Sequence, residues 1–387
     1  MAGTLPSLMH MLQGLIATPS VSSVSPEYDQ SNRPVVELLA DWAEALGFAV
    51  EVIDIPDHPD KANLIATLGG GPGGLVLSGH TDTVPFDEGL WSQDPFRLTE
   101  RDRRLYGLGT ADMKGFFALA LEAARALEAD ALHQPLILLA TADEESSMLG
   151  AKTLVELGRP KARHAVIGEP TGLRPVNAHK GIMMEAVRLI GHSGHSSDPA
   201  LGVNALEGMH AVLGAILDWR AELQAGHRDT RFHVPVPTLN LGHIHGGDNP
   251  NRICGECELH FDLRPLPGMG SAELRAGLRE RLGEVLSNSA LRWELRPLIE
   301  ETEPMHTDAD APIVRMAEAL TGYPAEAAAY CTEGPYLNAL GMETIILGPG
   351  YIDQAHQPDE YIALDNLQPM LDHLARLIER FCLRPAD

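Results

Sequence analysis

The 387-residue sequence is poor in cysteine and in basic residues, and it lacks long apolar runs. Four cysteines are too few for a disulfide scaffold in a chain of this length, which favours a reducing, cytoplasmic compartment. Only 29 lysines and arginines stand against 54 aspartates and glutamates, giving a net charge of −25. This charge argues against nucleic acid or an anionic membrane surface as the partner.

No stretch approaches the roughly 18 apolar residues that a membrane-spanning helix needs. The N-terminus has neither a basic segment nor an apolar segment of the signal-peptide kind. We therefore expect a soluble cytoplasmic protein with no membrane partner. Hydrophobic residues make up 44% of the chain, an ordinary value for a globular protein.

The length exceeds what one hydrophobic core usually serves, so two domains are expected. Alternating helix and strand patterns at both ends predict an α/β sheet covered on both faces. From about residue 182 the order becomes βαββαβ, which is typical of a split, ferredoxin-like arrangement. The sequence thus predicts an insert at 182–299 between two parts of a larger domain, 1–181 and 300–387.

The apolar patterns predict particular elements. In the first part we expect helices at 33–46, 113–129 and 149–157 and strands at 49–55, 63–68, 75–78, 136–140 and 165–168. In the insert we expect strands at 183–190, 238–243, 256–263 and 292–298 and helices at 203–224 and 271–286. A strand at 344–347 and a helix at 365–381 complete the chain.

Acidic and imidazole side chains gather where these apolar runs end and in polar loops: His80, Asp112, Glu145, Glu169 and His356. In open α/β sheets the ligand site lies beyond the carboxyl ends of the strands. Ligands of the His, Asp and Glu type suit zinc or a similar divalent ion. Taken singly, each has a plainer reading as a capped strand end, a helix N-cap, a solvated acidic turn or a surface loop.

Two neighbouring positions support a metal centre. Asp82 follows His80 by two residues, so on an extended chain both point the same way and Asp82 can accept the other ring N–H. Asp143, Glu144 and Glu145 would repel one another without a positive charge nearby. On an extended segment adjacent side chains point to opposite sides, so one glutamate can bind a metal while the other serves the reacting water.

The runs 79–85, 109–115, 143–145 and 168–170 follow in the order typical of the aminoacylase/carboxypeptidase family of di-zinc metallohydrolases, which this sequence resembles. The stretches 238–247, 251–254, 331–333 and 347–361 extend the resemblance over the whole chain. It implies a zinc-exopeptidase-like catalytic domain, a mixed sheet flanked by helices, with an inserted ferredoxin-like dimerisation or lid domain. It also implies a homodimer and a cis peptide bond after Asp112.

The resemblance implies roles for individual residues. His80 and Glu169 would hold one divalent metal, Glu145 and His356 the other, with Asp112 bridging the two; zinc is expected, and cobalt is an alternative. Asp82 would orient His80, Glu144 would be the general base, and His195 would stabilise the oxyanion, often across a dimer. Asn251 and Arg264 would bind the substrate carboxylate, and Glu333 is a candidate partner for its side-chain ammonium.

The implied activity is hydrolysis of a small N-acetyl amino acid, N2-acetyl-L-ornithine, to L-ornithine and acetate, a step of arginine biosynthesis. Alternatives with the same machinery are acetylcitrulline, succinyl-diaminopimelate or a dipeptide as substrate. A non-catalytic metal-binding protein is a further alternative. Glu144 disfavours it, because a binding protein has no use for a carboxylate beside the reacting water.

Overall fold

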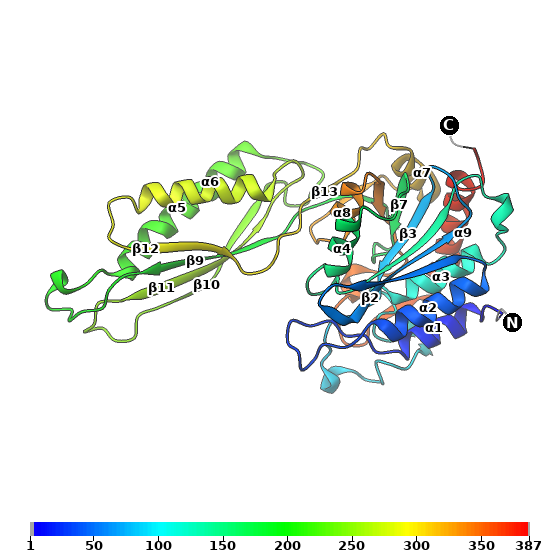
Figure 1. Ribbon diagram of the computed structural model, residues 1–387, viewed down its shortest axis with the longest axis horizontal. Helices are drawn as coiled ribbons and strands as arrows, with labels where there is room; N and C mark the ends of the chain where they lie inside the picture. Colours follow the sequence, from blue (N-terminus) through cyan, green and yellow to red (C-terminus); the bar gives the residue numbers. More distant parts are fainter. Residues whose placement is uncertain (1–3, 386–387) are drawn as a thin grey trace. The chain divides into compact units, whose positions relative to one another are not determined.

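The computed structural model describes residues 4–385, which form two compact units (Figure 1). Unit 1 contains the chain up to Asn177, His306–Glu326 and the residues from Thr332 onward. Unit 2 contains Ala178–Met305 and the short piece Ala327–Cys331. The expectation that the middle of the chain is an independent dimerisation or lid domain stays a prediction.

A mixed nine-stranded sheet forms the centre of unit 1 (Figure 1). The strand order is β1 (Ala49–Ile55), β2 (His58–Leu68), β6 (Leu136–Thr141), β3 (Leu75–His80), β7 (His164–Ile167), β15 (Glu343–Ile346), β8 (Val176–His179) and β13 (Met305–His306), with β14 (Glu326–Ala328) beside β8. β3 runs parallel to β6 and β7, and β7 runs parallel to β15. Every residue of β3, β6 and β7 is buried, as their apolar runs predicted.

Helices cover both faces of this sheet (Figure 1). One layer contains α1 (Leu8–Ile16), α2 (Arg33–Ala45), α3 (Lys114–Ala124) and α9 (Leu364–Phe381). The other contains α4 (Leu149–Leu157) and α8 (Gly334–Ala339), and α7 (Pro312–Thr321) packs on α9 and β15. The predicted mixed sheet flanked by helices is therefore confirmed.

The sequence patterns did not predict several short elements. A second sheet joins β4 (Thr99–Arg101), β5 (Arg104–Tyr106) and β16 (Tyr361–Ala363) in the order β16-β5-β4. Helices α1, α7 and α8 were not predicted, and α3 ends at Ala124 rather than near 129. The 3₁₀ turns are Glu88–Leu90, Ala129–Ala131, Pro199–Leu201 and Ile352–Gln354. Strands of three residues are too short to show a period in the sequence.

Unit 2 contains the βαββαβ order that the sequence predicted. Its elements are β9 (Met183–Ile190), α5 (Ala205–Gly226), β10 (Thr238–Gly246), β11 (Glu256–Arg264), α6 (Ser271–Val285) and β12 (Arg292–Pro297). The four strands form an antiparallel sheet in the order β10-β11-β9-β12. Asn204 caps α5 by accepting the N–H of Leu206.

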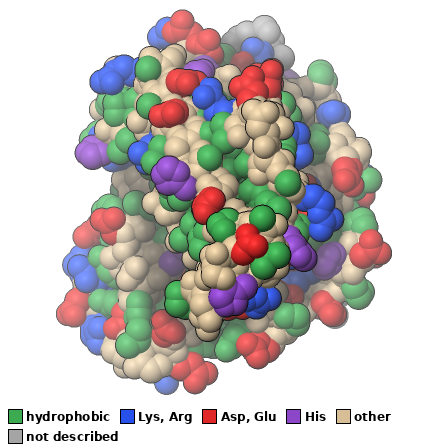
Figure 2. All heavy atoms as spheres, turned by 90° about the vertical axis from the view of Figure 1, so that its left-hand side faces the viewer, with side chains coloured by type: hydrophobic (Ala, Val, Ile, Leu, Met, Phe, Trp, Pro, Cys, Tyr) green, Lys and Arg blue, Asp and Glu red, His purple; other side chains and the backbone are tan. Residues whose placement is uncertain are grey.

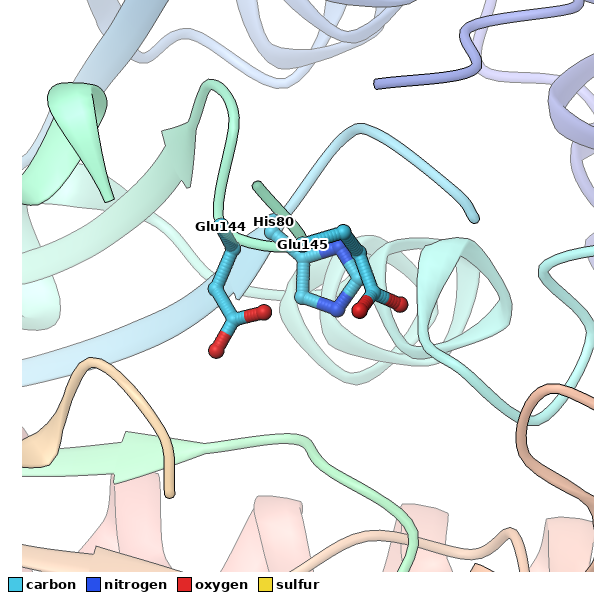
Figure 3. Close-up of side chains that lie close together, drawn as sticks. All are labelled: His80, Glu144 and Glu145. Carbon is cyan, nitrogen blue, oxygen red and sulfur yellow. The ribbon is translucent and has the colours of Figure 1, made fainter. Parts of the chain in front are cut away.

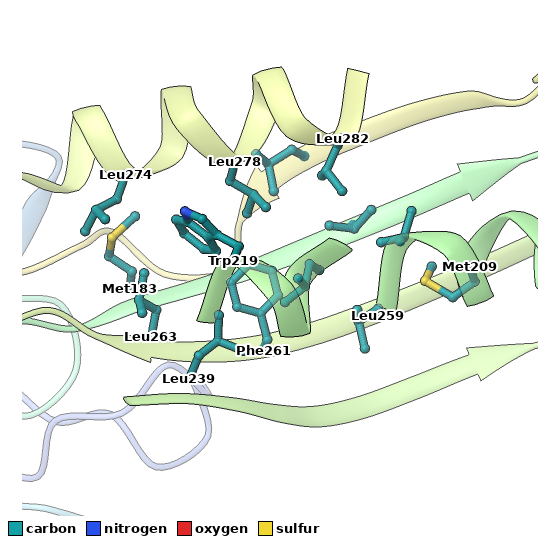
Figure 4. Packing of buried hydrophobic residues seen from close by; sticks show 14 of the residues in the cluster. Met183, Met209, Trp219, Leu239, Leu259, Phe261, Leu263, Leu274, Leu278 and Leu282 are labelled. Atoms are coloured by element: carbon teal, nitrogen blue, oxygen red, sulfur yellow. The ribbon is translucent and has the colours of Figure 1, made fainter. Parts of the chain in front are cut away.

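The core of unit 2 lies between one sheet face and the two helices (Figure 4). In β11 alternate residues are buried, so Leu259 and Phe261 face this core while Glu258 and His260 lie on the opposite face. Trp219 of α5 packs into the same cluster. Burial of each large apolar side chain contributes about 1.5–3 kcal/mol, which fixes the strand register.

On the face in Figure 2, acidic and basic side chains are interspersed, with histidines among them. Within residues 4–385, no helix combines the length and the apolarity needed to cross a bilayer.

Candidate metal centre

The predicted ligands meet because their strands are parallel neighbours. His80 is the last residue of β3, and Glu169 follows β7 by two residues. Glu145 lies in the segment that leaves β6, on the other side of β3. Since the carboxyl ends of these parallel strands lie at one edge of the sheet, the three side chains converge there. His80 and Glu169 are buried, with 1% and 6% of their surface exposed.

Two groups of metal-ligand side chains share one carboxylate. The ligand atoms of His80, Asp112 and Glu169 lie within 4.8 Å of one another, and so do those of Asp112, Glu145 and His356. His80 Nε2 lies 3.0 Å from Asp112 Oδ1, while His356 Nε2 lies 3.4 Å from Asp112 Oδ2. Each oxygen of Asp112 therefore faces a different imidazole, as a bridging ligand requires.

The remaining distances complete both groups. His80 Nε2 lies 3.4 Å from Glu169 Oε1, and His356 Nε2 lies 3.1 Å from Glu145 Oε1. Three carboxylates and two imidazoles converge, a donor set that fits divalent zinc, cobalt or manganese. The peptide bond between Asp112 and Met113 is cis, which confirms the expectation from the resemblance.

The backbone of Asp82 orients His80, whereas the sequence predicted this role for its side chain. His80 Nδ1 lies 2.9 Å from the carbonyl oxygen of Asp82 and 3.7 Å from its carboxylate. A carbonyl only accepts, so the proton is on Nδ1 and the lone pair of Nε2 points into the ligand group. The Asp82 carboxylate instead accepts the backbone N–H groups of Glu144 and Glu145, at 3.2 and 3.0 Å.

The acidic run adopts a turn, so the expectation of an extended segment was wrong. Asp143 has a φ of +54°, and its carbonyl accepts the N–H groups of Ser147 and Met148. Figure 3 shows that His80, Glu144 and Glu145 nevertheless reach the same region, and their ligand atoms lie within 4.8 Å of one another. The Asp82 carboxylate also holds two successive N–H groups of this turn, from 62 and 63 residues away in the sequence.

Burial and crowding shift the proton affinities of these groups. Burial raises the pKa of Glu144 well above its ordinary value, and the carboxylates of Glu169 and Glu145 raise it further. Burial also raises the pKa of Glu169 to about 8. Asp112 is the exception, because the imidazoles of His356 and His80 outweigh burial and hold its pKa below the usual range. Several buried carboxylates in one place require compensating positive charge.

Glu333 lies in unit 1, just before α8, and is almost fully buried, with 1% exposed. Neither carboxylate oxygen has a hydrogen-bond partner among the described residues. Burial raises the pKa of Glu333 to about 7, against the opposing influence of Thr141 and His80. The Thr141 hydroxyl itself donates to the carbonyl of Gly79, at 3.1 Å. Glu333 is thus a buried carboxyl group that receives no hydrogen bond from the described residues.

Two buried residues near this centre were missed by sequence reasoning. Lys61 donates to Asp143 Oδ1 at 2.7 Å, and Glu360 accepts the N–H of Asp112 at 3.0 Å. A lysine at the start of an apolar strand and a glutamate four residues after His356 were the available signals. Neither signal identifies a partner that is distant in sequence.

The other predicted site residues belong to unit 2. His195 is exposed, and its Nδ1 accepts the N–H of Ser197 at 3.2 Å, which leaves Nε2 to carry the proton. Asn251 is also exposed, and its backbone carbonyl accepts the N–H of Ser196. Arg264 Nε donates to Asp262 Oδ2 at 2.9 Å. Their roles in binding and catalysis stay predictions.

The fold and the paired ligand groups are those of a hydrolase that acts on amide bonds. Residues 76–380 match the model of Peptidase family M20/M25/M40, and the chain belongs to this family. It is 50% identical to the acetylornithine deacetylase of Vibrio campbellii and 48% identical to that of Pasteurella multocida, in each case over 98% of this chain and 99% of the relative. A dinuclear metal binding peptidase of Bacillus subtilis has the same fold, with a TM-score of 0.66, 13% identity and coverage of 97% and 98% of the two chains.

Proposed function

We propose that the chain hydrolyses N2-acetyl-L-ornithine to L-ornithine and acetate, as a cytoplasmic step of arginine biosynthesis. Identity of about 50% over nearly the whole length to proteins named acetylornithine deacetylase supports this substrate. The observation that carries the proposal is the position of Glu144. Its carboxylate lies within 4.8 Å of the ligand atoms of His80 and Glu145, beside two groups that share Asp112.

Two divalent cations, zinc or cobalt, would be held by His80, Asp112 and Glu169 and by Asp112, Glu145 and His356. When bound, such a pair acidifies a water toward a pKa of about 7 and polarises the amide carbonyl. Glu144 accepts the proton of the attacking water at a carboxylate oxygen. It then returns that proton to the amine nitrogen as the amide bond breaks. The low solvent exposure of Glu144, 8%, limits loss of the proton to bulk water.

A substrate panel tests this proposal. Cobalt- or zinc-loaded protein is assayed with N2-acetyl-L-ornithine, acetylcitrulline, succinyl-diaminopimelate and a dipeptide under identical conditions. We expect kcat/KM for acetylornithine to exceed the others by about tenfold or more, which corresponds to ~1.4 kcal/mol. A higher kcat/KM for any other substrate would assign the same machinery to that substrate instead.

Glu333 is proposed to recognise the side-chain ammonium of ornithine. A carboxylate that is 1% exposed and lacks a hydrogen-bond partner is costly unless a ligand supplies the donor. Acetylcitrulline carries a larger, neutral ureido group where acetylornithine carries its ammonium, so its binding should not depend on an ionic contact with Glu333. A charged hydrogen bond contributes about 1.5–3 kcal/mol.

The Glu333→Gln variant should therefore lose about tenfold or more in its preference for acetylornithine over acetylcitrulline. The exposed Glu37 of α2 offers a matched control, because Glu37→Gln makes the same chemical change far from the ligand groups along the chain. An unchanged preference in Glu333→Gln would remove Glu333 from substrate recognition and leave the hydrolytic machinery untouched.

The resemblance also supports a homodimer in which residues of unit 2 complete the substrate site. His195 would donate Nε2–H to the developing oxyanion, since its Nδ1 already accepts from Ser197. Asn251 and Arg264 would bind the substrate carboxylate. Light scattering tests the dimer directly, and a monomer at assay concentration would contradict it.

Complementation tests whether His195 acts across such a dimer. His195→Ala and Glu144→Gln homodimers should each be nearly inactive. A mixed dimer contains one site in which both groups are intact, so each mixed dimer should regain activity toward half of the wild-type value. Absence of any restoration, with mixed dimers present, would place His195 in the site of its own chain or outside catalysis.

A further inference from the structure

Glu360 binds three backbone N–H groups of the loop that carries Asp112. Its Oε1 accepts from Ala111 at 2.7 Å and from Asp112 at 3.0 Å, and its Oε2 accepts from Gly109 at 3.1 Å. The side chain is buried, with 1% of its surface exposed. A carboxylate has only acceptor sites and therefore satisfies all three donors, whereas an amide would turn its NH₂ group toward one of them.

The backbone around Glu360 joins the same two parts of the chain. The carbonyl of Glu360 accepts the N–H of Gly107 at 3.0 Å. The next residue, Tyr361, pairs with Tyr106 in the short sheet of β16 and β5. Glu360 also follows His356 by only four residues, so it connects the loop of His356 to the loop of Asp112.

The backbone of the loop that carries Asp112 is tightly packed. Gly109 has a φ of +85°, and a Cβ there would lie 2.6 Å from Lys114 Cε. A Cβ on Gly350 would lie 2.8 Å from that of Ala111. The backbone is therefore closely surrounded, and the carboxylate of Glu360 supplies the hydrogen-bond acceptors that its buried N–H groups need.

We propose that Glu360 is a positioning residue that holds Asp112 and His356 at the spacing at which both can bind one divalent cation. The inference rests on the metal pair in the proposed function and adds a residue that touches neither metal nor substrate. Partners of this kind orient the ligand residue, and their loss typically weakens metal binding by about 10–100-fold. If the role of Glu360 were purely structural, its replacement would change the stability of the protein but not its affinity for metal.

Cobalt binding distinguishes the two roles. Metal-free wild type, Glu360→Gln and Glu360→Asp are titrated with Co²⁺, and both the dissociation constants and the visible absorption spectrum are recorded. We expect Glu360→Gln to bind at least one Co²⁺ about 10–100-fold more weakly, with an altered spectrum. Glu360→Asp keeps the charge but reaches less far, so its affinity should lie between those of Glu360→Gln and wild type.

Asp353 provides the matched control, because it is an exposed carboxylate in the same loop region as His356. Asp353→Asn should bind Co²⁺ as wild type does. Wild-type affinities and spectra in both Glu360 variants would overturn the positioning role while leaving the proposed hydrolase intact. If Glu360→Gln does not fold, Glu360→Asp alone decides. Failure of wild type to bind Co²⁺ would overturn the metal pair and this role together.

Discussion

Lys61 and Asp143 form a buried ion pair in which Nζ lies 2.7 Å from Oδ1, with 4% and 7% of their side chains exposed. Lys61 also pairs with Asp29 at 2.7 Å, and the Ser22 hydroxyl donates to Asp143. Burial opposes the charge on Lys61, but the two carboxylates outweigh it and raise its pKa. Lys61 thus balances the charge of Asp143, the first acid of the run at 143–145. The positive charge of the metals would balance Glu144 and Glu145.

Replacing this lysine tests the ion pair. Lys61→Met leaves the buried Asp143 carboxylate without its cation and should destabilise the metal-free protein by about 3–5 kcal/mol. Denaturant unfolding measures the change. The exposed Lys161 is the matched control, and Lys161→Met should stay within about 0.5 kcal/mol of wild type. Equal stabilities for the two variants would contradict a role of Lys61 in holding the acidic turn.

Replacing the adjacent residues Glu144 and Glu145 one at a time should separate the loss of turnover from the loss of metal binding. Glu144→Gln should retain both metals but lower kcat by about 10²–10⁴-fold, because the amide cannot take the proton of the attacking water. Glu145→Gln should lower the metal content instead. Metal analysis beside steady-state assays measures both effects. Substantial turnover by metal-loaded Glu144→Gln would rule out its role as general base.

Metal removal should destabilise the protein in a way that depends on the shared ligand. Free Zn²⁺ at 100 times its dissociation constant should stabilise the folded protein by about 2.7 kcal/mol for each site. The effect is measured as the rise in thermal midpoint when Zn²⁺ is restored after chelation. Asp112→Asn should abolish most of this rise, since Asp112 belongs to both ligand groups. Glu169→Gln should remove only one part. Identical losses in the two variants would argue against a bridging carboxylate.

His164 should make stability depend on pH. Burial lowers its pKa to about 4, and Arg163 and Arg380 act in the same direction. Glu343 lies 3.1 Å from Nδ1 and opposes the shift, but its side chain is 33% exposed, so solvent screens it. The unfolded value is about 6.5, so the unfolded chain binds more protons between pH 4 and 6.5. His164 therefore contributes to the free energy of unfolding above pH 6.5, and this contribution, about 3 kcal/mol, is lost as the pH falls toward 4.

His164→Gln should flatten this pH dependence, and denaturant unfolding at several pH values measures it. The exposed His58 provides the control, because His58→Gln should keep the slope of wild type. Equal slopes for all three proteins would show that the pKa of His164 does not differ between the folded and unfolded states.

Three of the five ligand residues, His80, Glu145 and Glu169, could be located because they follow strong local patterns. Every residue of β3, β6 and β7 is buried, and the sequence marks such strands by apolar runs followed directly by polar side chains. Alternate burial in β11 and the long helix α5 likewise appear as periods in the sequence. Family motifs then attached roles to these positions.

The turn of the acidic run, the backbone contact of His80 and the partners of Lys61 and Glu360 could not be predicted. Lys61 and Asp143 lie 82 residues apart, and Glu360 and Asp112 lie 248 apart. No local period links such pairs, because their interaction exists only after the sheet has formed.

The sequence by itself determined the longer strands, the βαββαβ order and the residue types that can hold divalent cations, since hydrophobic periodicity and donor chemistry are local properties. Tertiary structure decided which oxygen of Asp112 faces which imidazole, and which buried charges hold the ligand loops. The physical reason is that hydrogen bonds and ion pairs between distant segments depend on directions and distances that the packed sheet alone creates.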